Sequence, residues 1–401
     1  MKPISFVIPA RDNLKYLKWA YASIRKNLHP ITADGVYYHE IVMADDASSD
    51  GTWSWLKEIA SKDRNVKIYH NPGPHRMGLT ILYDLLVEDF TTNDRIMFFH
   101  ADMYAAPGLD VEVNRHLDKK VAVCATRVEP PLHPEGPEKI VEDFGFEPED
   151  FKEREFLKFV DDNKSSKITN GIFAPWAVMK QDYWDIGGHD PLYAPQSKED
   201  SDVFNRFSVA GFEFIQTWAG LVYHLTSRGS RFRDGVGKDS EEWKWSNSKN
   251  MRNFARKWGT NVQHDPLMKP IVSPRFDIGF VVENCGLESL SILEPWCDRF
   301  YSDCSYENVK RYQKEEQPNT LYNLTNKIRP IPTESVEDSD INDITIEFDA
   351  KKLNQDNFQF LTRLGDIIDE SGEVGQMKYD IFRLTIHKKE RFEKDLVACK
   401  N

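Results

Sequence analysis

The feature that most constrains this chain is the alternation of short apolar runs with helix-length amphipathic segments over its first hundred residues. The apolar runs are rich in β-branched residues, and the segments between them repeat apolar side chains at helical spacing. Strands joined by helices form right-handed crossovers and give a parallel sheet covered on both faces. We therefore predict an α/β fold. The expected strands are residues 4–8, 40–44, 66–69, 95–99 and 121–125, and the expected helices are 14–28, 53–60 and 79–87.

The alternation fades after about residue 105, and the chain is predicted to have three parts. Residues 1–265 are expected to form the main α/β domain, residues 266–333 a helical or irregular connecting segment, and residues 334–401 a small α/β module. The acidic stretch 334–343 is typical of a linker. Residues 129–165, rich in Pro, Glu, Asp and Phe, have two interpretations. They are either a surface excursion pinned by aromatic side chains or a flap over an acceptor.

Composition excludes several classes of protein. The net charge of −13 over 401 residues argues against non-specific nucleic-acid binding, which needs a field of Lys and Arg. No run approaches the roughly 18–20 apolar residues of a membrane span, and the N-terminal apolar run is too short for a signal peptide. The five cysteines are scattered without a C-x-x-C pair. This usage is typical of a reducing compartment, so we expect a cytoplasmic protein.

Acidic residues follow three of the expected strands. Asp12 follows the first strand, Asp45 and Asp46 follow the second, and Asp102 follows the fourth. A parallel sheet binds its ligand beyond the carboxyl ends of its strands, so these side chains are expected at one edge. Helix capping is an alternative explanation for the first two groups. It explains Asp102 less well, because a carboxylate that ends an apolar strand is costly without a cation.

Three blocks of sequence resemble the glycosyltransferases of family two. They are I-S-F-V-I-P-A-R-D at residues 4–12, D-D-A-S-S-D-G-T at 45–52, and G-G-H-D at 187–190 with E-D-S-D-V-F-N-R at 199–206. The resemblance implies the GT-A fold, which is Rossmann-like with a mostly parallel central sheet flanked by helices. It implies an inverting, metal-dependent transfer of a hexose or pentose from a UDP- or GDP-sugar to a hydroxyl acceptor such as a glycan. It does not cover residues 270–401.

The resemblance also implies which residues bind the donor. Asp46 matches the aspartate that hydrogen-bonds the nucleotide base, and residues 9–12 match the segment that lines the base and ribose. Arg76 and Gly78 lie where family members contact the donor. The implied donor-binding residues are Pro9, Ala10, Arg11, Asp12, Asp46, Ser48, Arg76, Gly78 and Asp102.

A metal site is implied at residues 100–102, which occupy the position of the family's D-x-D motif. This chain has His100 in place of the first aspartate, which leaves Asp102 as the stronger ligand. His224 falls where a histidine completes the metal shell in many GT-A enzymes, although a lone histidine is more often structural. The expected cofactor is Mn²⁺ or Mg²⁺, and an imidazole ligand would favour Mn²⁺.

The resemblance places the general base at Asp200, which would take the proton of the acceptor hydroxyl. The alternative is that this acidic segment begins a helix, where carboxylates are favoured by the dipole. Trp176, Gly188 and Glu199 are the expected acceptor contacts. Trp176 is equally plausible as a core residue.

Other functions remain open from the sequence. A sugar-phosphate nucleotidylyltransferase shares the sheet but usually opens with a Gly-rich basic loop, where this chain has P-A-R-D. A non-catalytic protein that binds a glycan or a partner is a second alternative. A DNA base is a less favoured acceptor because of the acidic charge.

Overall fold

The computed structural model describes residues 1–29, 32–33, 35–229, 231–233, 235–332, 342–372 and 374–398. The chain divides into two compact units, which are described separately. The first unit holds Met1–Asn247, His264–Ile271 and Ala398, and the second holds Ser248–Gln263 and Val272–Val397. Most of the expected linker, residues 334–341, and Cys399 lie outside the described residues.

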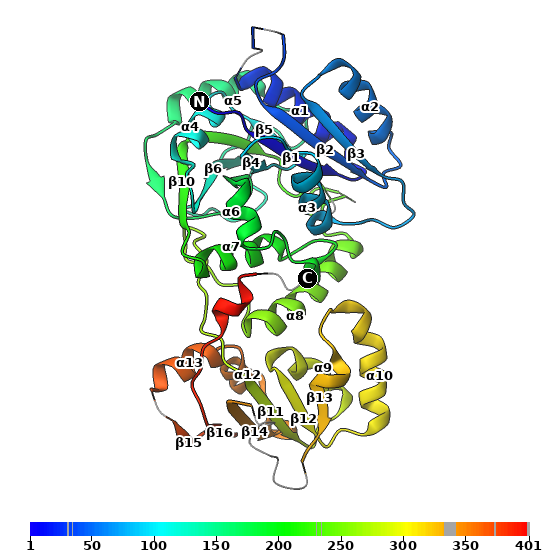
Figure 1. Ribbon diagram of the computed structural model, residues 1–401, viewed down its shortest axis with the longest axis vertical. Helices are drawn as coiled ribbons and strands as arrows, with labels where there is room; N and C mark the ends of the chain where they lie inside the picture. The colour runs from blue at the N-terminus through cyan, green and yellow to red at the C-terminus, as the bar shows by residue number, and fades with distance from the viewer. Residues whose placement is uncertain are drawn as a thin grey trace. The chain divides into compact units, whose positions relative to one another are not determined.

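The first unit is built on a large sheet (Figure 1). Its strands are β1 (Ser5–Ala10), β2 (Glu40–Asp46), β3 (Val66–Asn71), β4 (Arg95–Phe98), β5 (Met103–Ala105), β6 (Val121–Glu129), β7 (Ile140–Val141), β8 (Ile168–Thr169), β9 (Trp176–Met179) and β10 (Glu213–His224). The main path has the order β3-β2-β1-β4-β9-β6-β10-β5. β1 to β4 are mutually parallel, as are β6 and β10, whereas β9 and β5 run antiparallel to their neighbours. The expected α/β fold with a mostly parallel sheet is confirmed.

Helices flank this sheet. They are α1 (Leu14–Asn27), α2 (Thr52–Lys62), α3 (Leu79–Asp89), α4 (Leu109–His116), α5 (Glu153–Asn163), α6 (Lys180–Asp185), α7 (Glu199–Val209) and the first turns of α8 (Glu241–Trp258). α1 buries Leu17, Ala20 and Ile24, which are three or four residues apart and so share one face. The Oδ2 atom of Asp50 accepts a hydrogen bond from the Leu14 amide (2.8 Å) and thereby satisfies the start of α1. Capping thus accounts for part of the acidic turn after β2.

The strand register brings three loop starts together. Ala10 pairs with Asp45 and Val7 pairs with Phe98, so that parallel β1, β2 and β4 end at the same edge. These strands are buried on both faces, and their side chains leave only the edge open to a ligand. The acidic residues that follow these strands therefore lie at the same edge of the sheet.

Aromatic side chains hold residues 129–165 against the sheet. Phe144 and Phe156 are buried together with Tyr104 and Tyr223, and Phe151 packs against this cluster. The Tyr223 hydroxyl also accepts a hydrogen bond from the Phe144 amide (3.1 Å). These contacts favour the first of the two interpretations of residues 129–165, a surface segment pinned by aromatic side chains.

The second unit has its own mixed sheet, in the order β13-β12-β11-β14-β16-β15. The strands are β11 (Ile278–Glu283), β12 (Arg299–Ser302), β13 (Ile328–Pro330), β14 (Ile344–Asp349), β15 (Gly375–Tyr379) and β16 (Phe382–Ile386). The helices are α9 (Leu287–Leu293), α10 (Tyr306–Glu316), α11 (Leu324–Lys327), α12 (Gln355–Leu361) and α13 (Leu364–Ser371). Across the described parts of both units, no helix has the length and apolarity needed to cross a membrane.

This unit differs from the expected division at residue 333. β11, β12 and β13 come from residues 266–333, and β11 pairs in parallel with β14 from the expected module. The two expected parts therefore share one sheet and one hydrophobic core. Residues 355–371 form the two helices α12 and α13, and β15 and β16 form a hairpin at the edge of the sheet.

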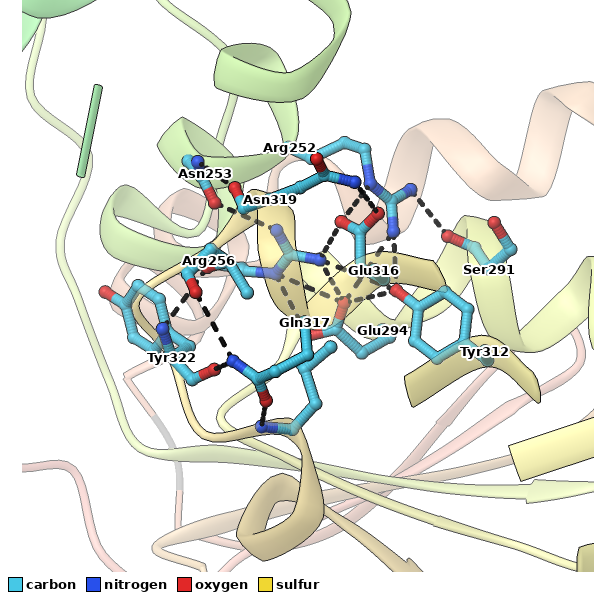
Figure 2. Close-up of polar contacts among 12 residues, drawn as sticks. Arg252, Asn253, Arg256, Ser291, Glu294, Tyr312, Glu316, Gln317, Asn319 and Tyr322 are labelled. Carbon is cyan, nitrogen blue, oxygen red and sulfur yellow. Dashed lines mark hydrogen bonds and ion pairs between the residues drawn. The ribbon is translucent and has the colours of Figure 1, made fainter. Parts of the chain in front are cut away.

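A buried ion-pair network holds the last turns of α8 within the second unit (Figure 2). Glu294 is fully buried and receives Arg256 Nη2 (2.6 Å), Lys327 Nζ (2.6 Å) and the Tyr312 hydroxyl (2.7 Å). Burial opposes ionisation of Glu294, but Lys327 and Arg256 outweigh it and hold its pKa well below the usual range. Removal of one partner would leave a buried charge uncompensated. The network therefore fixes the end of α8 to the rest of the second unit.

Candidate functional site

A cavity of about 310 Å³ lies at the carboxyl edge of the first unit's sheet. Loops after β1, β2, β4 and β10 form its wall, together with the starts of α3, α7 and α8. The lining residues are Pro9, Ala10, Arg11, Asp12, Asn13, Asp46, Arg76, Leu79, Leu82, Tyr83, His100, Ala101, Asp102, Gln196, Ser197, Glu199, His224, Ser227, Gly229, Arg231, Arg233 and Trp243. The three acidic turns expected at one edge each contribute a carboxylate to this cavity.

His100, Asp102 and His224 form a compact group of possible metal ligands. One ligand atom of each lies within 4.8 Å of those of the other two. The sheet explains this proximity, because β5 pairs antiparallel with the end of β10 and sets Met103 opposite His224. Asp102 precedes Met103, and its Oδ2 atom lies 3.6 Å from His224 Nε2. The expected ligands from distant parts of the chain are thus brought together.

Glu129, at the end of β6, orients His224. Its Oε1 atom lies 2.8 Å from His224 Nδ1, which leaves Nε2 to face Asp102. Arg127 (3.1 Å) and Lys139 (3.1 Å) in turn pair with Glu129. A carboxylate on the remote nitrogen of a ligand histidine fixes the tautomer that leaves the other nitrogen for a metal.

The pKa values of the two histidines in this group shift in opposite directions, since burial lowers the pKa of His100 whereas the pKa of His224 is raised. Burial alone would lower the pKa of His224, but Asp102 and Glu129 outweigh it and raise the value to about 9. Burial would raise the pKa of Asp102, yet His224 and His100 hold it well below the usual range. The cluster thus keeps a proton on His224 in the position that a cation could occupy. Two imidazoles and a carboxylate with an outer carboxylate fit a divalent metal.

Asp46 lines the cavity but is already heavily hydrogen-bonded. It accepts from the amides of Met77 (2.8 Å) and Gly78 (2.9 Å) and from Asn71 Nδ2 (2.7 Å). Its carboxylate therefore folds the loop before α3, in addition to facing the cavity. Gly78 has a φ of +89°, and a Cβ there would lie 2.4 Å from the Cα of Pro195. Only glycine fits this position without strain.

The loops after β1 and β2 support each other. The Ser48 hydroxyl accepts from the Asp12 amide (3.0 Å), and Asp12 Oδ1 accepts from the Ser49 amide (2.7 Å). Pro9, Ala10, Arg11 and Asp12 line the cavity, as the resemblance implies for donor contacts, whereas Ser48 and Gly78 are not among its lining residues. Ser48 and Gly78 therefore influence the site through the shape of the loops that form it.

Glu199 and Asp200 begin α7 next to the cavity. Glu199 lines it and is buried, and its Oε2 atom meets no hydrogen-bond partner within the described chain. Burial, together with the charge of Asp200, raises the pKa of Glu199 to about 8. Asp200 is half-buried and stands outside the lining set. Burial raises the pKa of the lining residue Tyr83, and the charge of Asp200 adds to this effect.

Trp176 and Gly188 lie away from the cavity lining. Trp176 is fully buried in β9 and stacks on Phe98 at a centroid distance of 4.1 Å, so the core interpretation of this residue matches the structure. The carbonyl of Gly188 accepts from Arg206 Nη2 (2.6 Å), and Arg206 pairs with Asp202 (2.8 Å). The third sequence block therefore ties the glycine loop to α7.

Sequence reasoning missed Glu129, Arg233, Glu242 and Trp243. Glu129 depends on the pairing of β6 with β10, which sets Val128 opposite Tyr223. Arg233 and Glu242 form an ion pair (3.2 Å) between the loop after β10 and the first turn of α8. No short motif signals either arrangement, because both depend on strand order and loop path.

Residues 5–187 match the model of glycosyl transferase family 2. The match contains the loops after β1, β2 and β4 and ends in the glycine loop before α7. Residues 5–187 are therefore similar to glycosyltransferase family 2, as the first two sequence blocks suggest. A search among curated proteins finds no match.

Several solved structures are similar to this chain. They include GalNAc-T7 with UDP, GalNAc and Mn²⁺, with 15% identity, TM-score 0.46, and coverage of 64% of this chain and 48% of that one. The mannosyltransferase PcManGT from Pyrobaculum calidifontis, in complex with GDP-Man and Mn²⁺, has 16% identity, TM-score 0.39, and coverage of 57% and 58%. S. aureus TarS 1-349 in complex with UDP-GlcNAc has 15% identity, TM-score 0.38, and coverage of 57% and 61%. This chain thus spans between 48% and 61% of those chains.

Proposed function

We propose that this protein transfers a sugar from a nucleotide-sugar donor to a hydroxyl acceptor with the help of a divalent cation. The observation that carries the proposal is the His100, Asp102 and His224 group at the wall of the cavity, in a chain with the family match. The same cavity presents arginine side chains to an anionic ligand. This combination suits a donor whose leaving group is a nucleoside diphosphate.

Asp102 and His224, with His100, would hold the metal. Mn²⁺ is favoured over Mg²⁺ because imidazole is a better ligand for the former. The bound cation would supply neutralisation of the departing diphosphate. The chain's own contribution is to hold His224 by Glu129 and Asp102 by the Arg228 amide (2.8 Å), so that the ligands are placed before the donor arrives.

We propose UDP- or GDP-sugar as the donor, with Asp46 next to its base. Asp46 retains capacity for one further hydrogen bond, since an ionised carboxylate has about four acceptor sites and three are used here. The base therefore meets a carboxylate that is fixed by the loop before α3. Substitution of Asp46 is expected to weaken donor binding partly through this loop.

Asp200 is proposed as the general base for transfer with inversion. The acceptor oxygen would attack the anomeric carbon while its proton passes to the carboxylate, and the bond from that carbon to the phosphate oxygen would break with the electron pair on the leaving group. Glu199 is the alternative base. It lines the cavity, and its pKa of about 8 is close to that of an effective base at neutral pH.

The test is transfer with defined variants. Wild-type protein with Mn²⁺ should release UDP or GDP from a matching donor sugar, and the product's anomeric proton should show inverted configuration by NMR. Asp200→Asn should bind the donor normally and turn over about 10²–10⁴-fold more slowly. Glu199→Gln is the matched variant, and a similar loss there with normal Asp200→Asn activity would move the base to Glu199. Retained configuration would contradict the proposed mechanism.

A further inference from the structure

Arginines from three parts of the chain meet at the first turn of α8. Arg11 follows β1, Arg76 precedes α3, and Arg231 and Arg233 lie in the loop after β10. All four line the cavity. The turn that they meet lies beyond residues 5–187 and is thus outside the region of the family match.

Glu242 is the residue that gathers three of these arginines. Its Oε1 atom receives Arg76 Nη1 (2.5 Å) and Arg11 Nη1 (2.7 Å), and its Oε2 atom pairs with Arg233 Nη1 (3.2 Å). Arg76 and Arg11 outweigh the effect of partial burial and lower the pKa of Glu242, so the carboxylate is ionised at neutral pH. Glu242 itself is not among the residues that line the cavity.

The pattern of used and unused donors points to a ligand. Glu242 engages Nη1 of both Arg11 and Arg76, whereas Nε of each is buried and meets no hydrogen-bond acceptor within the described chain. Arg76 Nε lies 4.0 Å from Asp46 Oδ2, beyond hydrogen-bond distance, and Arg76 Nη2 donates to Gln196 (3.2 Å). A buried donor without an acceptor costs free energy in the folded protein. An anionic ligand with several oxygen atoms would satisfy such donors and form charge-assisted hydrogen bonds with them.

Trp243, the next residue of α8, supports the fourth arginine. The Arg231 guanidinium lies 4.3 Å from the centroid of a Trp243 ring, and its Nε atom pairs with Asp239 (2.7 Å). Two neighbouring residues of one helical turn thus contact all four arginines of the wall. A fixed guanidinium loses less side-chain entropy on binding than a mobile one.

We propose that Glu242 is a positioning residue that holds Arg11, Arg76 and Arg233 in place for the phosphates of the donor. This inference rests on the proposed function, because it takes the anion to be the nucleoside diphosphate of a nucleotide sugar. Glu242 is not a lining residue, and it engages Arg11 and Arg76 through Nη1 and not through Nε. The first turn of α8 is then a part of the donor site.

The experiment measures binding of nucleoside diphosphates and of the matching nucleosides in the presence of Mn²⁺. UDP and GDP are titrated by calorimetry, and uridine and guanosine by ligand-observed NMR. Glu242→Gln should raise the Kd of the diphosphate that wild type binds by about 10-fold, with little change for its nucleoside. Glu241→Gln is the matched control, because Glu241 is adjacent, 89% exposed at its side chain, and paired with Lys244 at the surface.

Each outcome decides between interpretations. Equal or tighter diphosphate binding by Glu242→Gln would overturn the positioning role, as would an equal loss for diphosphate and nucleoside. If Glu242→Gln does not fold, Arg233→Gln removes one partner at a half-exposed side chain and should raise the diphosphate Kd by about 3-fold. Unchanged binding there would also overturn the proposal. Failure of wild type to bind either diphosphate would instead refute the proposed function.

Discussion

Replacement of Glu129 by Gln should weaken metal binding without removing any metal ligand. The glutamine keeps the shape of the side chain but loses the charge that lies 2.8 Å from His224 Nδ1. It no longer selects the tautomer that leaves Nε2 for the cation, because an amide can donate to Nδ1 as well as accept from it. Loss of such an outer carboxylate typically costs about 10–100-fold in metal affinity, or about 1.4–2.7 kcal/mol.

The assay is a calorimetric titration with Mn²⁺, accompanied by thermal unfolding of each protein. Glu138→Gln is the matched control, because Glu138 also pairs with Arg127 (3.9 Å) but stands apart from His224. Both variants remove a carboxylate from the surroundings of Arg127, so a loss confined to Glu129→Gln does not come from Arg127. Equal Mn²⁺ affinities in wild type and a folded Glu129→Gln protein would refute the orienting role of Glu129.

Three further predictions concern stability. Gly78→Ala should destabilise the first unit by at least about 1–3 kcal/mol in chemical denaturation, whereas Gly211→Ala, at a similar φ of +78° but in open space, should cost less. Glu199 has a folded pKa of about 8, above its unfolded value, so the folded state holds the extra proton between these values and stability should fall as pH rises towards 8. Glu199→Gln should flatten that fall in melting curves recorded from pH 5 to 8. Glu294→Ala should destabilise the second unit by about 3–5 kcal/mol, because the buried Lys327 ammonium loses its carboxylate partner, and a urea titration that finds less than 1 kcal/mol would contradict this.

The position of the site could be predicted from the sequence because parallel strands end at one edge. Asp12, Asp46 and Asp102 lie far apart along the chain, yet each follows an apolar run that can be recognised as a strand from the sequence. The structure places all three in one cavity. His224 joins them because β10 ends there, and this agrees with what the resemblance implies.

The residues that support the site could not be predicted in this way. Glu129 reaches His224 because β6 lies beside β10, and Glu242 reaches Arg11 because α8 begins near the loop after β1. Both contacts depend on strand order and on the path of a long loop, which have no local sequence signal. Trp176 shows the same limit, since only the antiparallel pairing of β9 with β4 directs it into the core.

The predicted boundary at residue 333 separates strands that pair with each other in the structure, and the reason is related. Residues 278–282 and 344–348 each have the pattern of a strand, but the pattern does not indicate that they pair with each other. Parallel pairing across more than sixty residues joins the two expected parts into one sheet. Hydrophobic periodicity identifies strands, whereas their partners are set by the packing of the whole unit.

The most direct test of the proposed function is a calorimetric titration of the wild-type protein with UDP- and GDP-sugars, in Mn²⁺ and in EDTA. In the cavity wall, Asp102 Oδ2 lies 3.6 Å from His224 Nε2, and both side chains are buried. We therefore expect the donor's diphosphate to bind there through a divalent cation held by these two residues. One class of donor should bind in Mn²⁺, and its affinity should fall by at least about 10-fold in EDTA. Binding of equal strength in EDTA, or no binding of either class in Mn²⁺, would contradict a metal-dependent nucleotide-sugar transferase.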